Sequence, residues 1–261
     1  NSAHTTLVES SAQTIDANSP GATITSSTVS SGASTATAAI ALAFDTGEST
    51  SGFAVGDISA SGCSLTSFAG SGSSYTVTCT PTSDGTPTVS VGAGTYSDGA
   101  GNGNTVSNTY TWTYDSTAPS TTITSSTVSS GASTSTAAIA LAFDTGESTS
   151  DFDVNDISAS GCSLTSFAGS GSSYTATCTA TSEGTPTVSV AAGTYNDGVG
   201  NDNTVSNTYT WTYDSTALSI TIASSTSGVT SGSTTNDANI ALTFTTSEST
   251  TGFAADDITV S

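Results

Sequence analysis

The chain has 261 residues, of which 21 are Asp or Glu and none is Lys or Arg, so its formal net charge is −21. It therefore lacks the basic side chains that contact phosphate, which excludes nucleic acid and anionic membrane surfaces as natural partners. Every carboxylate must be solvated, hydrogen-bonded or bound to a cation from outside the chain.

The polar composition, rich in Ser, Thr and Gly, is also typical of disordered, O-glycosylated stalks. However, apolar residues alternate with polar ones, as in Ile40, Leu42 and Phe44. Alternation with a period of two indicates half-buried strands. No helical periodicity is sustained, and no apolar run reaches the ~18 residues of a membrane span. We expect an all-β fold without direct membrane insertion.

The sequence repeats itself with a period of about 99 residues, since Cys63 recurs as Cys162 and Trp112 as Trp211. Residues 15–20 resemble residues 114–119, so the leading segment matches the end of a repeat. We predict the last strand of a preceding repeat plus a linker at 1–20, full repeats at 21–118 and 119–217, and the first three strands of a third repeat at 218–261. The chain is expected to be a window on a longer array, each full repeat having its own core.

Seven strands are predicted in the first full repeat, separated by breaks rich in Gly, Ser and Asp. Seven short strands in about 100 residues predict an immunoglobulin-like β-sandwich, with a seven-stranded barrel as the lesser alternative. The predicted strands lie near 22–29, 36–44, 56–61, 63–68, 73–81, 86–92 and 106–114.

The four cysteines form two pairs with the same spacing. Cys63 and Cys79 are equidistant from Ser71, in the middle of a Gly-Ser-Gly turn, so they would face each other across an antiparallel hairpin. Cys162 and Cys178 repeat this spacing, and we predict a disulfide in each repeat, formed in an oxidising compartment. Free buried thiols and a four-cysteine metal site are the alternatives, but there is no C-x-x-C motif.

The acidic loops carry the only chemistry that the sequence indicates. With seven strands, the loops between strands two and three and between strands six and seven lie at the N-terminal end of a repeat, beside the linker. Oxygen ligands from Asp, Glu and Asn are those that Ca²⁺ prefers, and ordinary turns with solvated charges are the alternative. The third copy has Thr245 in place of Asp144, so the predicted set leaves out Asp45 and Asp144. The predicted interdomain cation ligands are Asp16, Glu48, Asp98, Asn102, Asp115, Glu147, Asp197, Asn201, Asp214 and Glu248.

The residues give no support for catalysis or for an organic cofactor. The single histidine, His4, lies near the start of the chain, and no Ser or Thr has a His or Lys to activate it. Two binding surfaces are alternatives: Tyr110, Trp112 and Tyr114 as a sugar-stacking strip, and Thr-x-Thr runs as a flat hydroxyl array for ice or glycan. A core-facing strand and ordinary solvent-facing threonines are the simpler interpretations.

Several motifs resemble the bacterial Ig-like repeats of large surface adhesins. They are the segments 52–58, 64–78, 85–91 and 98–102, and Tyr114-Asp115-Ser116-Thr117-Ala118-Pro119. The resemblance covers both full repeats and the partial third. It implies extracellular modules that project a binding tip from the cell surface, often rigidified by Ca²⁺ between domains. The cysteine pairs and the absence of Lys and Arg depart from this pattern.

These observations predict an extracellular structural protein, either an adhesin stalk or a surface filament, acting as a cation-stiffened spacer or fibre. The expected partners are neighbouring repeats or copies of the same chain, and cell-surface glycans. O-linked sugars on the Ser/Thr surface would help to keep exposed sheet edges apart. The alternatives are a glycan- or ice-binding module and a eukaryotic flagellar-hair or sheath component.

Overall fold

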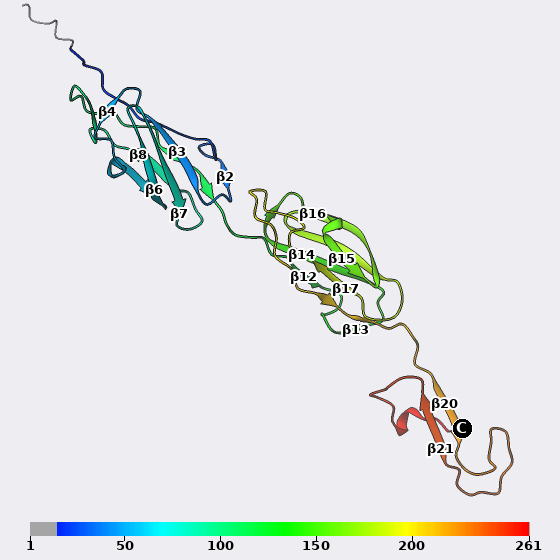
Figure 1. Ribbon diagram of the computed structural model, residues 1–261. Helices are drawn as coiled ribbons and strands as arrows, with labels where there is room; N and C mark the ends of the chain where they lie inside the picture. The colour runs from blue at the N-terminus through cyan, green and yellow to red at the C-terminus, as the bar shows by residue number, and fades with distance from the viewer. Residues whose placement is uncertain (1–14, 261) are drawn as a thin grey trace, which may run out of the picture.

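The structure is a computed structural model that describes residues 15–260. It contains two complete β-sandwiches and the beginning of a third, joined by short linkers and strung out along one direction (Figure 1). The described residues form strands and single turns of 3-10 helix, with no α-helix. The all-β, tandem immunoglobulin-like prediction is confirmed, and each full repeat has its own buried core.

The first sandwich consists of two antiparallel sheets. One has the strand order β1-β3-β7-β6 and the other β10-β8-β5. These strands correspond to the seven predicted ones and are mostly shorter at their ends. Their bounds are Thr23–Ser26 (β1), Ile40–Asp45 (β3), Ile58–Ser61 (β5), Cys63–Ser71 (β6), Ser74–Pro81 (β7), Thr88–Val91 (β8) and Tyr110–Thr111 (β10).

Four short strands complete this sandwich, of which Thr113–Tyr114 (β11) lies within the last predicted strand and the other three were not predicted. Ser34–Thr35 (β2) pairs in parallel with β11, while β10 in the same last segment of the repeat pairs with β8. Thr50–Ser51 (β4) pairs with Ser97–Asp98 (β9). The second pair brings together the two loops that were predicted to lie beside the linker.

The second sandwich repeats this arrangement with longer strands, because β14 continues through the segment equivalent to a predicted break and β16 covers both sides of the cysteine hairpin. One sheet has the order β12-β14-β16 and the other β15-β17-β18, and β13 pairs with β19. The bounds are Thr122–Ser125 (β12), Ser133–Thr134 (β13), Ala138–Thr149 (β14), Ile157–Ser160 (β15), Cys162–Ala180 (β16), Thr187–Val190 (β17), Tyr209–Thr210 (β18) and Thr212–Tyr213 (β19).

A turn of 3-10 helix precedes the third predicted strand in each copy. In the first, at Val55–Asp57 (η1), the Asp57 carboxylate accepts the Ala54 N–H at 2.8 Å. The same turn recurs at Val154–Asp156 (η2) and Ala255–Asp257 (η3). In each case the short acidic side chain satisfies a backbone donor that the turn leaves free.

The third copy contains Ile220–Ser224 (β20) and Leu242–Thr246 (β21), paired antiparallel. The prediction of three strands in this copy is wrong, because residues 258–260 do not form a strand. In the first repeat the corresponding β5 pairs with β8, and the described part of the third copy has no such partner. For the same reason Ile222 is 59% exposed, whereas its counterpart Ile24 is 2% exposed.

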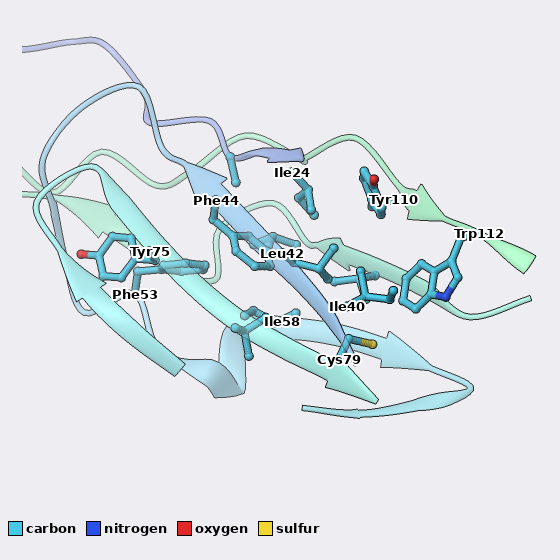
Figure 2. Close-up of a cluster of buried hydrophobic side chains, with 14 of the residues drawn as sticks. Ile24, Ile40, Leu42, Phe44, Phe53, Ile58, Tyr75, Cys79, Tyr110 and Trp112 are labelled. Carbon is cyan, nitrogen blue, oxygen red and sulfur yellow. The ribbon is translucent and has the colours of Figure 1, made fainter. Parts of the chain in front are cut away.

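The core of each full repeat follows the predicted alternation. Ile40, Leu42 and Phe44 are buried and lie opposite Cys79, Val77 and Tyr75 in register. Trp112 is fully buried at one end of this cluster (Figure 2). The facing residues belong to neighbouring strands of one sheet, β3 and β7, and share a buried cluster with Val89 and Val91 of the other sheet. Burial of each large apolar side chain contributes about 1.5–3 kcal/mol, so this cluster holds the two sheets together.

Both predicted disulfides are present, Cys63–Cys79 and Cys162–Cys178. The predicted register about Ser71 is wrong, however, because Leu65 is the residue opposite Cys79, and Cys63 lies opposite Pro81. The turn is at Gly72 and Ser73, and a bulge between Thr66 and Ala69 shifts the strands. The bridge is therefore diagonal, with 5.8 Å between its Cα atoms, which is within the range that disulfides require.

Candidate metal centre between repeats

The structure brings three predicted acidic residues together at each of two joints. Asp16, Glu48 and Asp98 form the first cluster, and their nearest carboxylate oxygens all lie within 4.8 Å of one another. Asp115, Glu147 and Asp197 form the second cluster under the same limit. We call these the first and second acidic joints.

Each acidic joint draws its residues from three separate segments. In the second, Asp115 belongs to the linker that follows β11, Glu147 lies in β14, and Asp197 lies in the loop between β17 and β18. The first joint uses Asp16 before β1, Glu48 between β3 and β4, and Asp98 at the end of β9. An odd number of strands places these loops at the N-terminal end of the repeat, as predicted.

The aspartate of the last loop is held rigidly by its own turn. Asp98 Oδ1 accepts the backbone N–H groups of Ala100, Gly101 and Asn102 at 2.9, 2.6 and 2.8 Å. Gly101 has a φ of 97°, which suits a residue without Cβ. In the second joint Asp197 Oδ1 accepts the equivalent three N–H groups.

An asparagine ties this loop to the linker. Asn102 Nδ2 donates to Asp98 Oδ2 at 2.7 Å and to the backbone oxygen of Asp16 at 3.1 Å. Asn201 Nδ2 makes the same contacts with Asp197 Oδ2, at 2.7 Å, and the Asp115 oxygen, at 3.0 Å. Here Asn102 and Asn201 position the aspartates, and their predicted role as ligands remains a prediction.

The surroundings of each joint shift the pKa values of the aspartate of the last loop and of the glutamate in opposite directions. The hydrogen bond from the Asn102 side chain, followed by the backbone N–H groups of the turn, lowers the pKa of Asp98 despite its burial. Burial acts to raise the pKa of Asp197, but the bonds from Asn201 and the turn outweigh it and lower that pKa. Asp98 and Asp197 are therefore held in the ionised form.

The glutamates behave in the opposite way. Burial raises the pKa of Glu48, and the charges of Asp16 and Asp98 raise it further. Burial followed by the charges of Asp115, Asp197 and Asp84 raises the pKa of Glu147. An external cation would remove this repulsion, because the chain has no Lys or Arg to do so.

The donor set fits a hard divalent cation. Ca²⁺ binds oxygen ligands at 2.3–2.6 Å, so two oxygens on the same ion are at most roughly 5 Å apart. The 4.8 Å limit within each acidic joint meets this condition without movement of the backbone. Carboxylate oxygens alone are not the ligands of a typical structural zinc site.

The remaining predicted ligands lie at the third joint. Asp214 and Glu248 line a shallow hollow together with Glu183 and Ser247. The structure does not place these two among the three-carboxylate clusters of the described residues, and Glu248 Oε1 is buried without a hydrogen-bond partner. Asp45 and Asp144, which the predicted set left out, are exposed and accept the N–H groups of Gly47 and Gly146.

Sequence reasoning missed two kinds of residue at the joints. Asn104 is buried, and its side chain bonds the backbones of Thr95, Tyr96, Gly92 and Thr105, closing the long loop that carries Asp98. Asp84 and Glu183 bind the linkers that leave their repeats. The only sign of Asp84 and Glu183 in the sequence was that both positions, one repeat period apart, are acidic.

The structure shows how exposed the residues of the two alternative binding surfaces are. Tyr110 and Trp112 are 4% and 0% exposed, so they cannot stack on a sugar, and that interpretation is wrong. The outer face of β12, β14 and β16 is a shallow hollow lined by small uncharged residues such as Ala140, Ala142 and Thr175. His4 lies outside the described residues, and the absence of enzymatic activity remains a prediction.

These features define the chain as a tandem array of immunoglobulin-like sandwiches with acidic joints. The family model described as bacterial Ig-like domain matches residues 16–114 and 115–213, and the chain belongs to this family. The match confirms the resemblance found in the motifs. No curated protein matches the chain.

Three solved structures with a similar fold are those of invasin, an adhesin and InvD. The bacterial integrin-binding protein invasin is 14% identical over 77% of this chain and 41% of its own, with a TM-score of 0.42. The Escherichia coli adhesin FdeC is 14% identical over 78% of this chain and 67% of its own, with a TM-score of 0.40. Yersinia pseudotuberculosis InvD is 14% identical over 78% and 62%, with a TM-score of 0.36. The chain thus spans well under half of invasin. Over residues 15–260 no helix is long and apolar enough to cross a membrane.

Proposed function

We propose that the chain is an extracellular spacer, part of an adhesin stalk or surface filament, whose joints are stiffened by Ca²⁺. The single observation that carries the proposal is the pair of acidic joints at equivalent places in consecutive repeats. Each joint combines one linker residue with two acidic residues of the following repeat, so a cation shared among them would fix the angle between linker and repeat.

Three further observations support an extracellular, mechanical role. The family is one of bacterial Ig-like domains. Each full repeat has a disulfide, and disulfides persist in oxidising compartments outside the cytosol. The chemistry of the two full repeats is nearly the same, as expected of a spacer whose length depends on the number of repeats. Its partners in this role are the neighbouring repeats, copies of the same chain in a fibre, and cell-surface glycans.

The test is a thermal melt of the full chain with Ca²⁺ and with EGTA, together with small-angle scattering. We expect Ca²⁺ to raise the melting temperature and to increase the longest dimension. The Glu48→Gln/Glu147→Gln variant should lose both responses. The matched control, Asp45→Asn/Asp144→Asn, removes the same number of charges from adjacent exposed positions and should keep them. Equal melting and scattering with Ca²⁺ and EGTA in the unmodified chain would overturn the proposal.

A further inference from the structure

A carboxylate of the preceding repeat accepts hydrogen bonds from the linker between the two full repeats. Asp84 Oδ1 accepts the Ser116 N–H at 2.8 Å and the Ser116 hydroxyl at 2.7 Å. Asp84 Oδ2 accepts the Thr117 hydroxyl at 2.7 Å. Three donors from two consecutive linker residues therefore converge on one ionised group, and hydrogen bonds to ionised acceptors are the stronger ones.

The same set of hydrogen bonds recurs one repeat later, with a glutamate in place of the aspartate. Glu183 Oε1 accepts the Ser215 N–H at 3.0 Å, the Ser215 hydroxyl at 2.9 Å and the Thr216 hydroxyl at 2.7 Å. The side chain is one methylene longer than that of Asp84, yet it reaches the corresponding three donors. The carboxylate and the Ser-Thr pair, rather than one particular side chain, are the shared features.

The gripped threonine also orients the acidic residue of the linker. Thr117 N–H donates to Asp115 Oδ1 at 3.0 Å, while the Thr117 hydroxyl is bound by Asp84. Asp115 is in turn a member of the second acidic joint. In the next linker Thr216 N–H donates to Asp214 Oδ1 at 3.0 Å. A continuous chain of hydrogen bonds thus connects Asp84 through Thr117 to Asp115.

The linker is held from the other repeat as well. Asn201 Nδ2 donates to the Asp115 oxygen at 3.0 Å, and the Thr204 N–H donates to the Pro119 oxygen at 2.9 Å. The two repeats also meet directly, because the Ala36 N–H donates to the Val199 oxygen at 3.4 Å. The linker between Tyr114 and Ser120 therefore forms hydrogen bonds with both repeats.

We infer that Asp84 and Glu183 are positioning residues that lock the linker leaving their own repeat and orient Asp115 and Asp214 toward the following one. The lock is made within the protein and is therefore present without a cation. Its effect on cation binding rests on the proposed function, and it makes the affinity of a joint depend on the repeat that precedes it.

The test uses the full chain and two measurements. The first is the hydrogen-exchange rate of the Ser116 amide by NMR in EDTA, which reports the lock alone. Asp84→Ala should accelerate this exchange at least tenfold, whereas Asp84→Glu, which copies the natural residue of the second repeat, should preserve protection. The second is Ca²⁺ titration calorimetry, in which loss of a group that orients a ligand typically weakens affinity by 10–100-fold.

Because Asp84→Ala also removes a charge near the joint, a neutral variant separates position from charge. Thr117→Val removes the hydroxyl contact and leaves every carboxylate in place, so it should weaken Ca²⁺ binding at the second joint several-fold. Thr113→Val, at an exposed strand position nearby, is the matched control and should bind as the unmodified chain does.

The possible outcomes are distinguishable. If Ser116 exchange is the same in Asp84→Ala and in the unmodified chain, the lock is wrong. Should Asp84→Ala lose protection while the unmodified chain binds no Ca²⁺, the lock stands and the cation-dependent spacer fails. If Thr117→Val binds Ca²⁺ with unchanged affinity, the lock does not orient Asp115, and that part of the inference is overturned.

Discussion

The Thr121 hydroxyl and the Tyr195 hydroxyl lie 2.7 Å apart in the second repeat, both buried, and form a hydrogen bond. The first repeat has Ala22 at the position of Thr121, and the Tyr96 hydroxyl is buried there without a partner. One substitution between two otherwise similar repeats thus leaves a polar group unsatisfied, which costs more than the hydrogen bond itself contributes.

This difference predicts that Ala22→Thr stabilises the first repeat. The new hydroxyl would reach Tyr96 as Thr121 reaches Tyr195, and we expect a gain of about 1 kcal/mol in the free energy of unfolding. Thr121→Val should destabilise the second repeat by a similar amount. Chemical denaturation followed by hydrogen exchange of core amides in each repeat measures both. Ala22→Val is the control for added volume, and it should give no gain.

The disulfides are expected to contribute substantially to the stability of each repeat. Cys63→Ala/Cys79→Ala should lower the free energy of unfolding of the first repeat by about 3 kcal/mol, because closing a loop of this length restricts the unfolded chain. Cys162→Ala/Cys178→Ala should act on the second repeat only. Urea unfolding of the two variants side by side is the measurement, and equal stability with and without reducing agent would contradict it.

The glutamates of the acidic joints predict a pH dependence in the absence of cations. Their raised pKa means that the folded chain holds these protons more tightly than the unfolded chain does. This contribution to stability is complete below the ordinary glutamate value of 4.5 and is lost as the pH rises through the folded pKa.

We therefore expect the free energy of unfolding in EDTA to fall as the pH rises above 4.5, the ordinary glutamate value. Glu48→Gln/Glu147→Gln should remove the share of this fall that the two glutamates cause and leave the share of Asp156, whose pKa is also raised by burial. Glu183→Gln is a suitable control, since the hydrogen bond from Thr216, followed by those from Ser215, lowers the pKa of Glu183. Its contribution is lost only as the pH falls, so this variant should keep the slope. A flat profile for the unmodified chain would contradict the prediction.

Removing one carboxylate should abolish Ca²⁺ binding at one joint only. Asp115→Asn leaves Glu147 and Asp197 without the third member of their cluster, so the calorimetric Ca²⁺ stoichiometry should fall by one site. Asp16, Glu48 and Asp98 are unaffected and should still bind. Asp144→Asn, exposed and outside the cluster, is the control. An undiminished stoichiometry in Asp115→Asn would show that the second joint is not a cation site.

Much of the fold could be predicted because the signals are local. Alternation of apolar residues places Ile40, Leu42 and Phe44 on one face of a strand, whichever strands surround it. The repeat period then carries each assignment to the second copy. Short strands such as β2 and β4 were missed because they consist of Ser and Thr, which have no apolar pattern, and they exist only where a partner strand passes.

The acidic joints were predicted in outline because strand parity places alternate loops at the same end of a sandwich. Asp16, Glu48 and Asp98 are far apart in sequence, yet a count of strands was sufficient to bring them together. The cysteine pairing was right although the register was wrong, because the turn lies at Gly72 and Ser73 and displaces Cys63 from the position opposite Cys79, and a diagonal disulfide spans that offset.

The amino-acid sequence by itself determined the fold class, the repeat, the buried alternating rows and the acidic character of the joints, because each follows from residue type and spacing along one segment. Only the tertiary structure decided which carboxylates act as hydrogen-bond acceptors for their own turns, and that Asp84 grips the linker at Ser116. Such contacts depend on the distance between segments brought together by packing, to within about 1 Å, and a hydrogen bond forms or fails over that range.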